Sequence, residues 1–190
     1  EVHEALVEQG FSALALHGEQ EQREREEMLV RFANRSCNVL IATDVAARGL
    51  DIKELPMVIN FDIASDADTH IHRIGRTGRA GSHGIALSLV TPRDGHRART
   101  IAEHQQLDLN WKRIPSTKSA TAHAAAFITI AVDGGRQDKV RPGDLLGALT
   151  GDAGLPGSAV GKIDVFPTRS YVAIAREWHH KAVERLRTGT

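Results

Sequence analysis

The first 115 residues alternate between short apolar runs and helix-forming segments, and this alternation restricts the fold more than any other feature. The runs at residues 11–16, 38–42, 57–61 and 84–90 are mainly apolar and have the length of strands. Helices are predicted between and after them, at residues 19–34, 67–74 and 93–105. Apolar strands that alternate with helices are typical of a parallel sheet with helices on both faces. We therefore predict an α/β domain over residues 1–115.

The pattern changes after residue 115. Residues 116–122 are small and polar, which predicts a linker. Residues 123–190 then indicate a strand at 126–132, a helix that begins near Pro142, strands at 161–166 and 171–175, and a helix at 176–187. The order β-α-β-β-α is that of an RNA-recognition motif (RRM) without its last strand, so we predict a small α+β, RRM-like domain. The chain opens inside a helix and stops before that strand, and we expect both ends to be truncated.

Composition excludes several classes of protein. Cys37 is the only cysteine and can form no disulfide within the chain, so we expect a structural thiol in a reducing, cytoplasmic setting. No apolar run approaches the roughly 18–20 residues that a membrane span needs, and no membrane partner is expected. The histidines show no metal-ligand spacing, so no metal site is predicted. Net charge is zero, but residues 116–190 carry 10 Lys/Arg against 7 Asp/Glu, which permits nucleic acid as a partner.

The most informative stretch is HRIGRTGR at residues 72–79. Its arginines are separated by glycines at the end of a predicted helix. Guanidinium groups match phosphate oxygens bidentately and remain charged at any relevant pH. Glycines let a backbone approach a ligand closely. A basic helix end that only pairs with acids or with water is the alternative, and for Arg73 a salt bridge is as good an explanation.

Two further stretches lie where a parallel sheet binds its ligands. TDVAARGLDI at residues 43–52 follows the predicted strand 38–42, and ligands of open α/β sheets bind at the carboxyl ends of strands. HGE at residues 17–19 leads into Gln22 and Arg25, which are three residues apart and share one helix face. A solvated helix face is the alternative for Gln22 and Arg25.

Together these stretches resemble three conserved motifs of the second RecA-like domain of DEAD-box RNA helicases. The resemblance covers residues 1–115. It implies that ATP, with Mg²⁺, sits between this domain and an N-terminal RecA-like domain that holds most of the ATP and metal contacts. It also implies that RNA lies across both domains.

The resemblance assigns roles to individual residues. Arg76 and Arg79 match the two arginine fingers, and His72 matches the position that couples the two domains. Asp51 matches the carboxylate that binds the nucleotide ribose, although a helix-capping role is the alternative. Positions on the RNA side, which hold the sugar-phosphate backbone, are matched by Gly18, Gln22, Arg25, Thr43 and Arg48.

Residues 123–190 resemble the C-terminal RNA-binding domain of the DbpA group of these helicases, through RPGDLLGAL at 141–149 and GKI at 161–163. This resemblance implies binding to a hairpin of large-subunit ribosomal RNA and a role in ribosome assembly. The two central strands offer only Phe127 and Tyr171 for base stacking, and Phe127 is as readily a core residue. Basic residues are therefore the RNA-binding candidates, with a solvated surface as the alternative for each: Lys139, Arg141, Lys162 and Arg169.

Three functions remain open at this point. The first is the C-terminal part of an ATP-dependent RNA helicase; with no GK[ST] phosphate loop and no Asp-Glu-Ala-Asp sequence, this chain alone is predicted not to hydrolyse ATP. The second is a stand-alone RNA-binding module. The third is a DNA-directed enzyme of the same superfamily, which a preference for a ribosomal RNA hairpin over duplex DNA would exclude.

Overall fold

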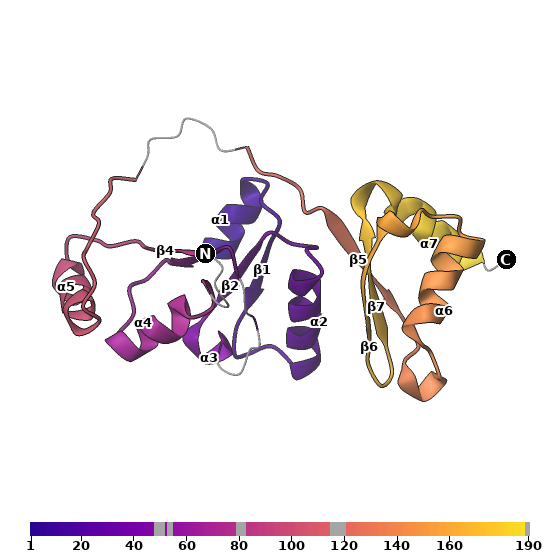
Figure 1. The fold of residues 1–190 in the computed structure, drawn as a ribbon, viewed down its shortest axis with the longest axis horizontal. Coiled ribbons are helices and arrows are strands. Elements are labelled where there is room, and N and C mark those ends of the chain that lie inside the picture. The colour runs from indigo at the N-terminus through magenta and orange to yellow at the C-terminus, as the bar shows by residue number, and fades with distance from the viewer. Residues whose placement is uncertain (48–51, 53–54, 79–82, 115–120, 189–190) are drawn as a thin grey trace. The chain divides into compact units, whose positions relative to one another are not determined.

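The computed structural model describes residues 1–47, 52, 55–78, 83–114 and 121–188 (Figure 1). The chain divides into two compact units. Unit one combines Glu1–Ala47 with Ala120–Thr190, and unit two is Arg48–Ser119. The predictions for Arg48, Asp51 and Arg79 fall outside the described residues.

The first part of unit one is a parallel strand pair joined by a helix. Helix α1 (Val2–Glu8) precedes β1 (Ala13–Leu16), α2 (Gln22–Ala33), β2 (Val39–Ala42) and the short α3 (Asp44–Ala47). Strands β1 and β2 pair in parallel, with Leu14 opposite Leu40. Adjacent parallel strands need a crossover connection, and α2 provides it.

Unit two repeats this arrangement. Strands β3 (Met57–Asn60) and β4 (Ile85–Ser88) pair in parallel, and α4 (Ala67–Ile74) connects them. Helix α5 (Gly95–His104) follows and lies against α4, where the Gln105 side chain donates to the Ala67 carbonyl at 3.1 Å. A sheet with helices on both faces, as predicted, would bury its apolar strands, but several side chains of this strand pair are exposed. Residues Met57, Ile59, Ile85 and Leu87 are exposed.

The second part of unit one, here called the tail, is an antiparallel sheet with two helices. Its elements are β5 (Phe127–Val132), α6 (Pro142–Gly147), β6 (Val160–Val165), β7 (Ser170–Ala175) and α7 (His179–Thr188), with short 3-10 or π turns between several of them. The spatial order is β5-β7-β6. The predicted order β-α-β-β-α is therefore confirmed, and Pro142 opens α6 as expected.

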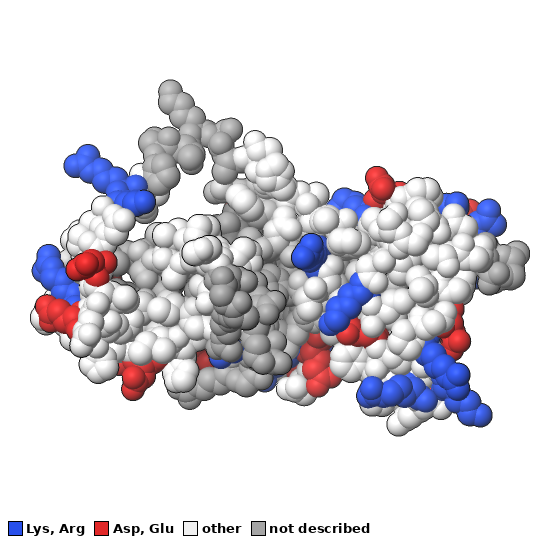
Figure 2. Space-filling model, viewed as in Figure 1, with Lys and Arg blue, Asp and Glu red and all other residues white. Residues whose placement is uncertain are grey.

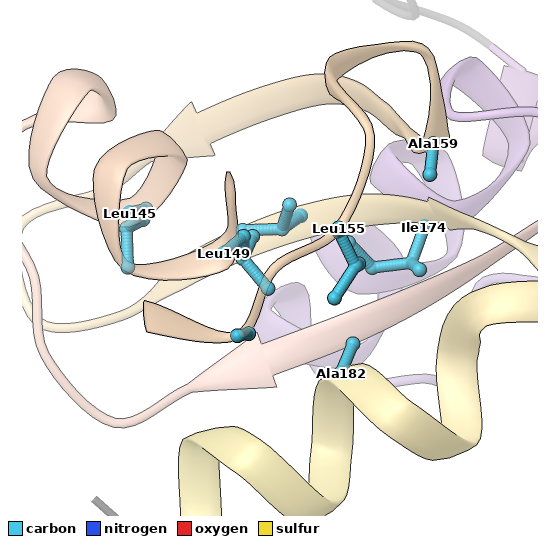
Figure 3. Packing of buried hydrophobic residues seen from close by; sticks show 8 residues of the cluster. Leu145, Leu149, Leu155, Ala159, Ile174 and Ala182 are labelled. Atoms are coloured by element: carbon cyan, nitrogen blue, oxygen red, sulfur yellow. The ribbon is translucent and has the colours of Figure 1, made fainter. Parts of the chain in front are cut away.

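The tail has its own hydrophobic core. Leu145 and Leu149 from the α6 segment face Ile174 of β7 and Ala182 of α7, and Leu155 and Ala159 complete the cluster (Figure 3). Fully burying a leucine or isoleucine side chain contributes about 1.5–3 kcal/mol. Because β7 is the central strand, this cluster fixes which face of the sheet is inward.

No helix among the described residues is long and apolar enough to cross a membrane.

Candidate functional site

Helix α4 carries the first part of HRIGRTGR, and its start is well capped. Asp66 is the N-cap: its carboxylate accepts from the Ser65 hydroxyl at 2.6 Å and from the Thr69 amide at 2.7 Å. These hydrogen bonds, Ser65 first, lower the pKa of Asp66 to about 2. The cap fixes where the helix begins and therefore where His72, exposed in the last turn, is presented.

Arg73 anchors α4 to the carboxyl end of β3. Its Nη1 donates to the carbonyl of Asp62 at 2.7 Å, and it makes a longer contact of 3.5 Å to Asn60 Oδ1. The sequence left the role of Arg73 open, and these contacts are those of a residue that positions the helix.

The turn after α4 is hydrogen-bonded to Leu55, which lies two residues before β3. The Leu55 amide donates to the Arg76 carbonyl at 3.0 Å, and the Thr77 hydroxyl donates to the Leu55 carbonyl. Leu55 and Thr77 form an isolated parallel bridge. The main chain at Arg76 is thus held on both sides, and its side chain is half-buried.

The TDVAARGLDI stretch begins where β2 ends. The Thr43 hydroxyl accepts from the Ala46 amide at 3.3 Å, and Thr43 is exposed. Residues Asp44–Ala47 form α3, a helical turn that the sequence did not predict. The structure thus places Thr43 at the carboxyl end of a parallel strand, as expected.

Arg25 of α2 reaches this stretch. Its guanidinium Nη2 donates to the Ala46 carbonyl at 3.2 Å, and its Nε is buried without a hydrogen-bond partner among the described residues. Arg25 therefore does not only contact solvent on a helix face; its guanidinium supports the end of α3. Gln22, one turn earlier, is exposed and donates to Glu26 at 3.0 Å.

Gln20 was not singled out from the sequence. Its side chain accepts from the His17 amide and donates to the Ala15 carbonyl, both at 3.0 Å. These bonds shape the turn that contains Gly18, where an added Cβ would meet nothing within 4 Å. A polar residue two positions after the Gly was the only available signal, and it is a weak one.

The four basic candidates of the tail fall into two kinds. Lys162 pairs with Asp164 at 2.9 Å, and Arg169 pairs with Asp133 at 2.6 Å, a hydrogen bond that raises the pKa of Arg169. Lys139 and Arg141 are exposed in the segment between β5 and α6.

The described residues do not fit a Mg²⁺ site, since no three His, Cys, Asp or Glu side chains among them cluster as metal ligands would. Cys37 is also no candidate for chemistry. It is 4% exposed, and burial raises its pKa to about 11. The prediction of a structural thiol is consistent with this environment.

Comparisons with known proteins agree with the two halves of the chain. Residues 1–81 match the family of the helicase conserved C-terminal domain, and residues 129–190 match the DbpA RNA binding domain. The ATP-dependent RNA helicase DbpA of Escherichia coli K12 is 52% identical over 188 residues, which are 99% of this chain and 41% of that protein. The chain thus spans about two fifths of this relative.

Solved structures give the same result. The crystal structure of the E. coli DEAD-box protein SrmB bound to regulator of ribonuclease activity A is 38% identical and superposes with a TM-score of 0.57, covering 63% of this chain and 73% of that one. A DEAD box protein from Methanococcus jannaschii, also 38% identical, gives 0.53 and covers 56% and 30%. The RecA-like fold predicted for the first part is confirmed. The chain belongs to the DEAD-box RNA helicases, and within them to the DbpA group.

Proposed function

We propose that this chain is the C-terminal part of an ATP-dependent RNA helicase, formed by a RecA-like domain at residues 1–115, a linker at 116–122 and an RNA-binding domain at 123–190. The observation that carries the proposal is the 52% identity to a protein of that name along nearly the whole chain, across both parts. The parent protein hydrolyses ATP when RNA is bound and separates short duplexes. Its ATPase site is shared with an N-terminal RecA-like domain that holds most of the contacts to ATP and Mg²⁺.

Arg76 and Arg79 act as arginine fingers in this proposal. Their guanidinium groups stabilise the charge that develops on the transferring phosphoryl group, which is worth about 10³–10⁵ in rate. That range corresponds to about 4–7 kcal/mol. The hydrogen bond from the Leu55 amide to the Arg76 carbonyl supports the role, because it fixes the main chain that carries the guanidinium group. A preorganised guanidinium donor needs no rearrangement during the reaction. Asp51 binds the ribose, and His72 couples the two domains.

RNA is held through its backbone on the other motifs. The residues that contact sugar and phosphate, so that this domain does not read sequence, are Gly18, Gln22, Arg25, Thr43 and Arg48. The hydrogen bond from Arg25 to the Ala46 carbonyl supports its part in this, because it also holds the end of α3. The tail supplies the selectivity: it binds a hairpin of large-subunit ribosomal RNA and brings the motor to ribosome assembly in the cytoplasm.

The test is reconstitution of RNA-stimulated ATP hydrolysis. We expect the chain alone to release no phosphate from ATP above background, with or without RNA. Addition of the N-terminal RecA-like half in trans should restore RNA-stimulated release. In that mixture Arg76→Ala should lower the rate about 10³-fold or more, whereas Arg93→Ala, an exposed arginine outside the motifs, should not. Hydrolysis by the chain alone, or equal rates for both variants, would refute the proposal.

The alternative function is a stand-alone RNA-binding module. It predicts that no N-terminal half restores hydrolysis, while RNA binding persists. The same reconstitution separates the two, provided that binding of the RNA is measured in parallel by fluorescence anisotropy.

A further inference from the structure

The outer face of the tail sheet offers little for base stacking. Positions on β5 and β7 that point away from the hydrophobic core are paired in register, Thr129 with Ala173 and Ala131 with Tyr171. Tyr171, the aromatic residue of β7, is 6% exposed and packs edge-on against Phe166 with ring centroids 5.7 Å apart. Stacking of a base needs an open ring face. Tyr171 does not present one.

Phe127 has a packing role on the same face. An added Cβ at Gly161 would lie 3.0 Å from a ring carbon of Phe127 and 3.1 Å from the Cβ of Ala173. The ring therefore fills the space above Gly161. Thr129 is the next residue of β5 on this face, and its hydroxyl is hydrogen-bonded to that of Ser36 at 2.6 Å, within unit one.

Most other cations of the tail have acceptors within the tail. Lys162 and Arg169 are in the ion pairs given above, Arg176 Nε donates to the Ala125 carbonyl at 2.6 Å, and Lys181 Nζ donates to the Gly154 carbonyl at 3.2 Å. A ligand that recruited these groups would first have to break these contacts.

The segment 136–141, here called the basic turn, is different. The side chains of Arg136, Lys139 and Arg141 are exposed and form no ion pair or hydrogen bond with any residue that the structure describes. The two nearby carboxylates are occupied by main-chain amides instead. Asp138 accepts from the Gly135 amide at 2.9 Å, and Asp144 accepts from the Arg141 amide at 3.0 Å. Figure 2 shows Lys and Arg side chains projecting from the end of the tail where this segment leads into α6.

The basic turn is also held in one conformation. The amides of Arg136 and Gln137 donate to the carbonyls of Phe166 and Pro167, both at 2.9 Å, which ties it to the β6–β7 connection. Lys139 has a left-handed backbone with φ of 64°, and the Val140 amide closes the turn on the Gly135 carbonyl at 3.0 Å. The contact to Phe166 and Pro167 leaves no room for a Cβ at Gly135. A fixed backbone lowers the entropy that a ligand must remove on binding.

We propose that the basic turn is the RNA phosphate-binding surface of the tail, with Arg136, Lys139 and Arg141 contacting consecutive phosphates of a folded RNA. Lys162 and Arg169 then stabilise the domain through their acids. This inference rests on the proposed function, that the tail binds RNA, and adds where the RNA lies. Phosphate is the ligand that fits, since arginine forks bind it bidentately and the turn has no exposed aromatic or aliphatic anchor of the kind that dominates protein interfaces.

The first experiment is an anisotropy titration of the full chain. The probe is a labelled hairpin from large-subunit ribosomal RNA, at several salt concentrations, beside a hairpin of equal length with a scrambled loop. The variant Arg136→Ala/Lys139→Ala/Arg141→Ala should bind both hairpins on the order of tenfold to a hundredfold more weakly. Its plot of log K against log salt should be less steep by about 2–3, at roughly 0.7–0.9 per phosphate contact.

The matched control removes the same charge elsewhere. The variant Arg93→Ala/Arg99→Ala/Lys112→Ala changes three exposed cations of unit two and should keep the affinity and salt dependence of the unaltered chain. Circular dichroism melts of each variant verify folding. Binding by the basic-turn variant that equals that of the unaltered chain would overturn the inference alone. Failure of the unaltered chain to bind either RNA would overturn the proposed function with it.

A second measurement needs no variant. Acetylation of lysines in the unaltered chain, with and without the RNA hairpin, is read by mass spectrometry. We expect RNA to protect Lys139 and to leave Lys162 as reactive as before. Equal labelling of Lys139 in both samples, or protection of Lys162 alone, would contradict the assignment even if the triple variant failed to fold.

Discussion

At the residue scale, Gly84 allows close packing against the turn that follows α4 and carries Arg76. An added Cβ there would lie 2.5 Å from the Gly78 amide nitrogen and closer still to the Thr77 hydroxyl. Gly84→Ala should therefore push this turn aside and lower the free energy of unfolding by about 1–3 kcal/mol in urea denaturation. Gly95→Ala, where nothing lies within 4 Å, is the control and should be close to neutral. Equal stability of the two variants would show that the turn yields without cost.

Cys37 permits a test of burial at one atom. Its pKa, raised to about 11 by desolvation, keeps the thiol protonated in the folded chain at pH 8. The raised pKa means that the folded state holds the thiol proton more tightly than the unfolded state. The contribution of this proton to the free energy of unfolding is therefore present below about pH 9 and is lost as pH rises towards 11. Iodoacetamide should alkylate the native chain slowly at pH 8, and faster towards pH 11. The urea-unfolded chain should react rapidly at pH 8. A native rate at pH 8 that matches the unfolded one would contradict the burial.

At the scale of elements, the cap of α4 connects helix stability with pH. Asp66→Ala removes an acceptor from the Thr69 amide and should lower Tm by about 2–4 °C, whereas Asp66→Asn keeps an acceptor without the charge and should lower Tm by less at neutral pH. Because the pKa of Asp66 falls from 3.8 to about 2, the contribution of its charge is complete above about pH 4 and is lost as pH falls towards 2. Thermal melts across pH 2–5 should show this loss in the unaltered chain and a smaller one in Asp66→Asn.

Most elements could be predicted from the sequence, because apolar spacing and end signals act locally. Helix α4 matches its predicted bounds of 67–74, and Pro142 opens α6. The π-helix Ala148–Asp152 was missed, since a shift of one residue in hydrogen bonding leaves no mark in apolar periodicity. Helix α3 was missed because four residues are too few to show a helical period.

The candidate site was predictable in its residue types but not in its pairings. The motifs identified Arg25, yet only the fold shows that its guanidinium meets the Ala46 carbonyl. Likewise, Asp138 and Asp144 could each have paired with a neighbouring cation. Both carboxylates accept from main-chain amides instead, which leaves the positive charges of the basic turn without a carboxylate partner among the described residues. This choice depends on backbone geometry that sequence spacing does not specify.

At the scale of the whole molecule, unit two exposes a continuous apolar surface. The register of β3 and β4 places Met57 beside Ile85 and Ile59 beside Leu87, and all four side chains are exposed. Patches of this kind bind apolar dyes. The chain should therefore enhance the fluorescence of ANS (8-anilinonaphthalene-1-sulfonate) under native conditions. Ile85→Thr/Leu87→Thr should reduce the signal, whereas Val45→Thr, which changes an exposed apolar side chain outside this strand pair, should not. Undiminished dye binding by the double variant would place the responsive surface elsewhere.

The bridge between Leu55 and Thr77 has a mechanical consequence. Both main-chain polar groups of Leu55 are used: its amide donates to the Arg76 carbonyl, and its carbonyl accepts from the Thr77 hydroxyl. Leu55 and the turn at Arg76 and Thr77 are therefore expected to move together. A displacement of Leu55 would therefore reach the main chain of Arg76 directly, through one hydrogen bond. In amide exchange, Leu55 should lose its protection whenever the loop after α4 opens.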